Sequence, residues 1–168
     1  MNRFIFVLTI FSLLTLSDYW ATYNNIVECP EKYWWVNSLP LSYNEKIAYC
    51  EGNPTARKVI SSLGRDGLVL MAGAELFIIY ILSLKLFETS RLLKVPASFF
   101  FAFLLLYSLC HLCGALSWIV EPELDTLLFL WNLGSIFFLS GVMFLLGGIT
   151  FLFAKFFNEV LGSVPPEK

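Results

Sequence analysis

The chain has few charged side chains and only one histidine. Charged residues make up 14% of its 168 residues, whereas a soluble domain typically has about 25%. The net charge is −2 and no basic run is longer than Arg57-Lys58, so the chain lacks the positive surface that nucleic-acid binding requires. One histidine among scattered acids also falls short of the four close ligands of a structural zinc site, and we predict no metal site.

The sequence signatures of hydrolases and nucleotide-binding enzymes are missing as well. There is no His-Glu-x-x-His motif, no glycine-rich phosphate loop and no serine–histidine arrangement on a strained turn. What the chain has in abundance is apolar residues, at 58%, with 17 phenylalanines. This composition excludes a disordered chain and leaves too little polar surface for a water-facing globule. We therefore predict an integral membrane protein in contact with the lipid bilayer.

Four apolar stretches are long enough to cross a bilayer, which needs roughly 20 residues of helix. They cover about residues 4–23, 67–87, 96–120 and 126–157, and residues 24–66 form a long polar connection between the first two. The pattern predicts an all-α fold, an integral membrane four-helix bundle that forms a single transmembrane domain over residues 1–168. Within the connection, the sequence predicts short helices over 43–49 and 54–63, with Asn53 as the cap of the second.

The first stretch has a second interpretation, a cleaved signal peptide. Cleavage after Ala21 would place the bulky Tyr19 at position −3, where a small residue is expected. We therefore favour a retained span.

Basic residues in the short connections predict the orientation. The connection over 88–95 contains Arg91 and Lys94, whereas the connection over 121–125 has three acids and no base. Because basic short loops stay in the cytoplasm, we expect a multi-pass protein of the cell membrane with both termini cytoplasmic and residues 24–66 outside. The long connection carries basic residues too, but long loops follow this rule weakly.

The four cysteines fall into two pairs. Cys29 and Cys50 lie in the connection predicted to be extracytoplasmic, where thiols oxidise, and we predict a disulfide between them. Cys110 and Cys113 lie three residues apart in the third span, so both are on one face of the helix.

A loop pair of cysteines with an intramembrane Cys-x-x-Cys resembles the vitamin K epoxide reductase group of thiol oxidoreductases. The resemblance implies that Cys110 and Cys113 are the pair beside a quinone and that Cys29 and Cys50 shuttle electrons to them. The chain departs from that group because its Cys-x-x-Cys lies well inside the third span and not near the outer start of the fourth.

Each span carries one polar residue at a comparable depth. These residues are Asp18, Glu75, His111 and Asn132. An ionisable group in hydrocarbon costs about 2.5–3.5 kcal/mol even on a lenient scale, so each needs a partner, and His111 is the natural partner of Glu75. Two interpretations stay open: a polar clasp between helices, and a site for a cation, a proton or a small ligand.

A second resemblance rests on Asp18 and Thr22 at the end of the first span and on Glu51-Gly52-Asn53-Pro54 before the second. These motifs are similar to those of an uncharacterised family of short multi-pass membrane proteins. The resemblance implies the architecture and that Asp18, Glu51 and Asn53 act together at the outer membrane boundary. Two departures are the inserted residues 26–49 and Glu75, which stands where the family tends to have a basic residue.

The leading hypothesis is a non-enzymatic membrane protein without a cofactor. It binds a small ligand or cation, or a membrane-protein partner such as a second copy, through five residues: Asp18, Glu51, Glu75, His111 and Asn132. The alternative is a quinone-linked thiol–disulfide oxidoreductase that uses Cys29, Cys50, Cys110 and Cys113.

Overall fold

The computed structural model describes residues 2–119 and 124–162, and all the regular elements in these ranges are helices. Four of them are long: α1 (Asn2–Asn25), α6 (Gly67–Leu92), α7 (Ser98–Ile119) and α8 (Leu124–Gly162). Each of the four is long and apolar enough to cross a membrane. The predicted all-α class and the four apolar spans are confirmed.

Helices α1, α6 and α8 extend past the predicted spans, most of all α8, whereas α7 is slightly shorter than the span predicted over 96–120. Its 39 residues correspond to roughly 58 Å, about twice the thickness of the hydrocarbon core. Hydropathy marks where side chains are apolar, whereas a helix continues until the backbone is broken. At the end of α6 this break is visible, because Lys94 has a positive φ of 55° and the Ser90 hydroxyl donates to the Val95 carbonyl at 2.6 Å.

Between α1 and α6 the chain forms a 3-10 turn, Ile26–Glu28, and four short helices: α2 (Cys29–Lys32), α3 (Trp34–Asn37), α4 (Tyr43–Tyr49) and α5 (Pro54–Leu63). The bounds predicted for α4 and α5 are confirmed. The Asn53 side chain caps α5 by accepting from the Thr55 and Ala56 amides at 2.9 and 3.4 Å. The sequence does not predict α2 and α3, because one helical turn is too short to show a periodic pattern.

The predicted disulfide between Cys29 and Cys50 is present and joins α2 to the end of α4, with the two Cα atoms 6.3 Å apart. Next to it lies an apolar core that packs the short helices against the ends of α1 and α6. Its buried members are Ile26, Ile47, Ala48, Ala56, Ile60 and Leu68. We call residues 26–66 the outer segment. The disulfide and this core hold it as a packed cap on the long helices.

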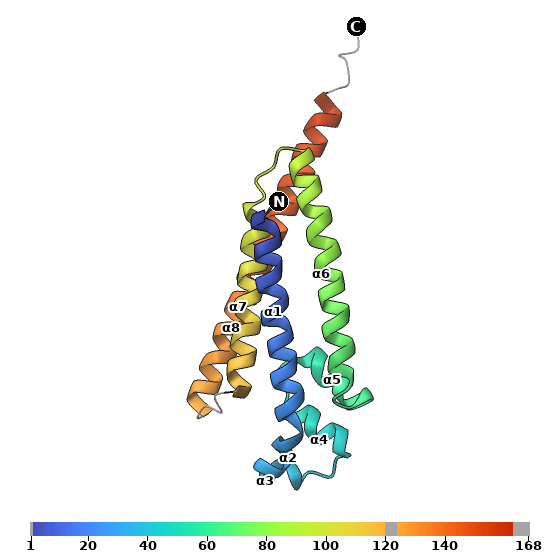
Figure 1. The fold of residues 1–168 in the computed structure, drawn as a ribbon, viewed down its shortest axis with the longest axis vertical. Helices are drawn as coiled ribbons and strands as arrows, with labels where there is room; N and C mark the ends of the chain where they lie inside the picture. Colours follow the sequence, from blue (N-terminus) through green and yellow to red (C-terminus); the bar gives the residue numbers. More distant parts are fainter. Residues whose placement is uncertain (1, 120–123, 163–168) are drawn as a thin grey trace.

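The long helices form a row in which α6 packs on α1, α1 on α7 and α7 on α8. In Figure 1, the outer segment lies at the lower end, and the N-terminal end of α1 and the C-terminal end of α8 lie toward the upper end. Helix α8 approaches α7 closely because Gly134 and Gly141 face it. A Cβ at Gly141 would lie 3.4 Å from the Phe103 carbonyl oxygen. In the part of the chain that the structure describes, α6 and α8 do not pack along each other.

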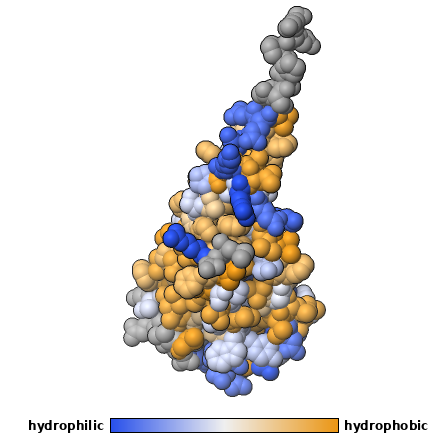
Figure 2. All heavy atoms as spheres, turned by 45° about the horizontal axis from the view of Figure 1, so that its top comes forward, coloured by the Kyte–Doolittle hydropathy of each residue, from blue (hydrophilic) through white to orange (hydrophobic). Residues whose placement is uncertain are grey.

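Apolar side chains cover the middle of the molecule, and polar residues gather toward its two ends (Figure 2). Large apolar residues are exposed on all four long helices, for example Phe6, Phe77, Leu105 and Phe144. This distribution is what a lipid-facing surface requires, because lipid tails solvate apolar side chains. The few polar side chains between the ends are therefore the residues to explain.

Candidate functional site

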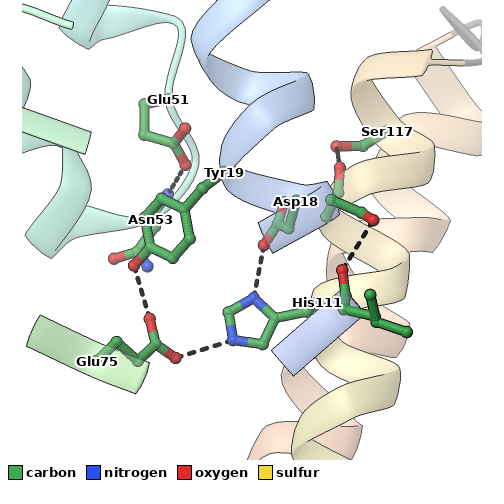
Figure 3. Close-up of polar contacts among 10 residues, drawn as sticks. Asp18, Tyr19, Glu51, Asn53, Glu75, His111 and Ser117 are labelled. Carbon is green, nitrogen blue, oxygen red and sulfur yellow. Dashed lines mark hydrogen bonds and ion pairs between the residues drawn. The ribbon is translucent and has the colours of Figure 1, made fainter. Parts of the chain in front are cut away.

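Three long helices meet at a single histidine. His111 of α7 lies between two carboxylates, with its Nδ1 2.8 Å from Asp18 Oδ2 of α1 and its Nε2 2.8 Å from Glu75 Oε1 of α6 (Figure 3). The Tyr19 hydroxyl donates to the other oxygen of Glu75, Oε2, at 2.6 Å. We call these four residues the acid–histidine cluster.

The cluster has a defined proton count. Each of the two 2.8 Å contacts needs a hydrogen between nitrogen and oxygen, and a neutral imidazole carries only one N–H. The second hydrogen is therefore on the ring, which makes it a cation, or on a carboxyl group. In both cases the smallest number of protons that satisfies the two contacts leaves a net charge of −1 on Asp18, Glu75 and His111. A third proton or a bound cation neutralises this charge.

The two carboxylates are not completely enclosed. The side chain of His111 is 8% exposed, whereas those of Glu75 and Asp18 are 15% and 21% exposed. Their open sides border a cavity of about 1050 Å³ that is lined by α1, α6, α7, α8 and residues 51–56 of the outer segment. The remaining negative charge therefore faces a space large enough for a small organic molecule.

Glycine at position 114 is what allows Asp18 to reach His111. A Cβ at Gly114 would collide with the Asp18 carboxylate. Gly114 is one turn from His111 on α7, so the same helix supplies the histidine and the space for its partner. Hydropathy and spacing assign Gly114 only a packing role, because the contact joins residues almost a hundred positions apart.

The Glu51 carboxyl lies at the outer end of the cavity and is buried. Its Oε1 accepts from the Asn53 amide at 2.7 Å, and the Arg57 side chain donates to the Glu51 carbonyl oxygen at 2.7 and 3.1 Å. Burial raises the pKa of Glu51 to about 7, with a further contribution from the charge of Asp18 and against the lowering effect of the Asn53 amide. Glu51 and Asn53 are thus in direct contact, and both line the same cavity as Asp18.

Asn132 does not join the cluster. It lines the cavity, but its side chain is exposed and makes no hydrogen bond to any residue that the structure describes. Counting along helices predicts only the depth of a residue. The direction in which its side chain points depends on how the helix is rotated, and α8 turns Gly134, not Asn132, toward α7.

The two cysteine pairs lie in different parts of the molecule. Cys110 and Cys113 are free thiols in the wall of the cavity, and Cys113 Cβ would lie 3.3 Å from a Cβ at Gly134. Cys29 and Cys50 are joined to each other within the outer segment and are not among the residues that line the cavity.

Two tyrosines belong to the site although no sequence pattern predicts them. Tyr19 is next to Asp18, where an aromatic residue near a span end is expected to mark the interface. Tyr107 is one turn from His111 on α7, its ring centroid 5.0 Å from the imidazole, and it lines the cavity. In the sequence, only its spacing of four residues from His111 indicates that Tyr107 lies near the site.

The Asp18–His111 contact should depend on the absence of a side chain at position 114. We expect Gly114→Ala to lower the melting temperature in detergent, corresponding to a loss of about 1–3 kcal/mol, because Asp18 must leave His111 to avoid the new methyl group. The matched control is Gly73→Ala on α6, where a Cβ meets nothing within 4 Å, and it should be neutral or slightly stabilising. Equal melting temperatures for the two variants would contradict this account of Gly114.

The Glu51 carboxyl should make stability depend on pH. Its pKa rises from the ordinary value of 4.5 to about 7 on folding, so the folded chain binds more protons than the unfolded chain between these values. Stability should therefore fall as the pH rises from about 4.5 to 8, with a contribution from Glu51 on the order of 3 kcal/mol.

Glu51→Gln tests this dependence, because the amide oxygen still accepts from the Asn53 amide but does not titrate. Thermal unfolding measured at pH 5 and pH 8 should show that this variant loses less stability between the two pH values than the wild type does. The exposed Glu31→Gln should behave like the wild type. If wild type and Glu51→Gln lose the same stability, another group is responsible.

Comparison with protein families, with curated proteins and with solved structures gives no match for the chain. The two resemblances described above therefore stay predictions. The function has to be argued from the geometry of the site.

Proposed function

We propose that this chain is a multi-pass membrane protein whose cavity binds a small organic cation through the acid–histidine cluster. The observation that carries the proposal is the unbalanced charge: two carboxylates share one histidine and border a cavity. A net negative charge at this depth is costly without a counter-charge. A ligand with a positively charged group supplies one, and its hydrogen-bond donors match the open carboxylate oxygens.

The lining of the cavity supports an organic cation over a metal ion. No group of three or more histidine, cysteine, aspartate or glutamate side chains among the described residues is arranged to hold a metal. Aromatic side chains share the cavity with the two acids instead: Tyr19, Tyr107, Trp118, Trp131 and Phe138 are among its lining residues. Aromatic faces attract ammonium groups, and the attraction increases when water is excluded.

A purely structural clasp would not need the cavity. An interhelical hydrogen bond inside a membrane contributes about 0.6 kcal/mol on average, and a neutral hydrogen-bonding side chain could serve at either ring nitrogen of the histidine. The second carboxylate adds a net negative charge that these hydrogen bonds do not require. Binding of a cation gives this charge a purpose, and the clasp then fixes the geometry of the binding site.

The proposal includes the arrangement in the membrane. The four long helices form the bundle of a cell-membrane protein with both termini in the cytoplasm and the outer segment outside. Two features support this orientation. Arg91 in the last turn of α6 and Lys94 in the α6–α7 connection are basic, and the Cys29–Cys50 disulfide belongs in an oxidising compartment.

A binding measurement tests the function. In lipid nanodiscs, isothermal calorimetry should detect binding of 2-phenylethylammonium to the protein. The uncharged 2-phenylethanol should bind at least tenfold more weakly. Glu75→Gln keeps a hydrogen-bonding group beside His111 but removes one of the two carboxylates that the ammonium contacts, so it should weaken the binding of the ammonium by about 10–100-fold, or about 1.5–3 kcal/mol. Glu88→Gln is the matched control, because Glu88 is an exposed acid of the same helix and does not line the cavity.

Two results would contradict the proposal: equal binding of the alcohol and the ammonium, or unchanged binding in Glu75→Gln. The double variant Cys110→Ser/Cys113→Ser separates the proposal from the alternative, the quinone-linked thiol–disulfide oxidoreductase. A binding protein should keep its affinity for the ammonium without these thiols. An electron relay requires them and should also yield mixed disulfides with Cys29 or Cys50 when only one is replaced.

Thiol labelling in intact cells tests the orientation. A membrane-impermeant maleimide should label Cys29 and Cys50 only after reduction, because both sulfurs are oxidised and the outer segment faces the outside. Labelling of Cys29 and Cys50 in inverted vesicles but not in intact cells, both after reduction, would reverse the orientation. Labelling without a reductant would contradict the disulfide.

A further inference from the structure

The two ends of the cavity differ in polarity. The end next to the outer segment is lined by polar side chains: Glu51, Asn53, Thr55, Ser117 and Asn132. The opposite end, farther along α6 and α8, is lined by apolar ones: Ile78, Ile79, Phe138 and Leu139. The acid–histidine cluster lies between them. A ligand that fills the whole cavity therefore needs a polar or charged group followed by an apolar body.

The outer segment partly covers the polar end. Residues 51–56 belong to the lining, and Gly52 packs against the ring of Trp131 of α8, where a Cβ would lie 3.3 Å from the indole. This contact joins the outer segment to the helix at the far end of the row. It narrows the route from water to the cluster.

The apolar end is open at the side. Helices α6 and α8 stand at the two ends of the row and do not pack along each other in the described residues, with α1 and α7 between them (Figure 1). Ile78 on α6 and Leu139 on α8 both line the cavity, yet they are 59% and 62% exposed. Both therefore lie on a surface that lipid tails cover in a membrane. The cavity opens toward the bilayer at this point.

The lining residues of the two walls follow helical spacing, which makes the opening a continuous trough. On α6 they include Met71, Ala74, Glu75 and Ile78, and on α8 they include Trp131, Ser135, Phe138 and Leu139. The trough runs along the helices. An amphiphilic ligand lying in the trough has its polar end at the cluster and its apolar end toward the middle of the membrane. An amphiphile in the leaflet next to the outer segment has the same alignment.

We propose that the occupant of this cavity is a single-chain ammonium amphiphile that enters from the bilayer between α6 and α8, an inference that rests on the function proposed above. The ammonium group lies against Asp18 and Glu75, and the chain lies between Ile78 and Leu139. Because the alkyl chain of the amphiphile moves from the apolar bilayer into an apolar cavity, the charged ammonium group provides the selectivity. The trough sets which shape of molecule can reach it.

Photolabelling in nanodiscs tests the inference. The probe is dodecylammonium with a diazirine in the middle of its chain. It should label peptides of α6 around Ile78 and of α8 around Leu139. Excess dodecylammonium should reduce this labelling at least tenfold, and excess dodecanol should not. Labelling that persists in Glu75→Gln, or that dodecanol removes equally well, would show unspecific contact with lipid-exposed helices and overturn the inference.

Blocking the opening tests the contribution of the alkyl chain separately from that of the ammonium group. Ile78→Trp should reduce labelling and the affinity for dodecylammonium at least tenfold, and it should reduce the affinity for 2-phenylethylammonium by a much smaller factor. The control is Phe77→Trp, since Phe77 is exposed on the same helix but does not line the cavity. Leu139→Trp and its control Ile136→Trp repeat the test on α8 and guard against misfolding of one variant.

The outcomes distinguish this inference from the proposed function. If 2-phenylethylammonium binds in a Glu75-dependent way and dodecylammonium does not, the function stands and the lipid-like occupant is wrong. If neither binds, both proposals are wrong. If Ile78→Trp changes the oligomeric state and dodecylammonium does not compete, a helix of a second copy fills the trough, and the inference is overturned.

Discussion

A charged side chain inside a membrane needs a partner, and the partnership of His111 with two carboxylates organises the long helices. His111 binds Asp18 of α1 through one ring nitrogen and Glu75 of α6 through the other. Helix α6 packs on α1 but has few other contacts with α7, so the contact between Glu75 and His111 is what links it to α7. The same contacts fix the rotation of three helices, because an imidazole offers only two directions for hydrogen bonds.

The other elements support this arrangement. Gly114 leaves room for the Asp18 carboxylate, and Gly134 and Gly141 bring α8 close to the face of α7 next to the cluster. The outer segment, closed by the Cys29–Cys50 disulfide, places Glu51 and Asn53 at the end of the cavity. The glycines and the disulfide thus have the same structural role. They hold polar groups from distant parts of the chain around a shared space.

The arrangement combines stability with an unsatisfied charge. Tyr19 and His111 give Glu75 two hydrogen-bond partners, which is enough to hold it away from lipid. The net charge of the cluster is not removed by these contacts, and the cavity lies where a counter-charge would have to sit. The polar outer end, the acidic middle and the apolar side opening follow one another along the helices. This order is the physical basis for both proposals.

The sequence by itself determined the four apolar helices, the short helices α4 and α5, and the Cys29–Cys50 disulfide, because these depend on local composition, capping residues and the compartment of the thiols. It also indicated His111 as the natural partner of Glu75, since His111 can donate a hydrogen bond or carry a positive charge. Only the tertiary structure decided that Asp18 completes the pair and that Tyr19 and Tyr107 join the site, whereas Asn132 stays apart. The reason is physical: position along a helix sets depth, but the packing of one helix on another sets the direction in which each side chain points.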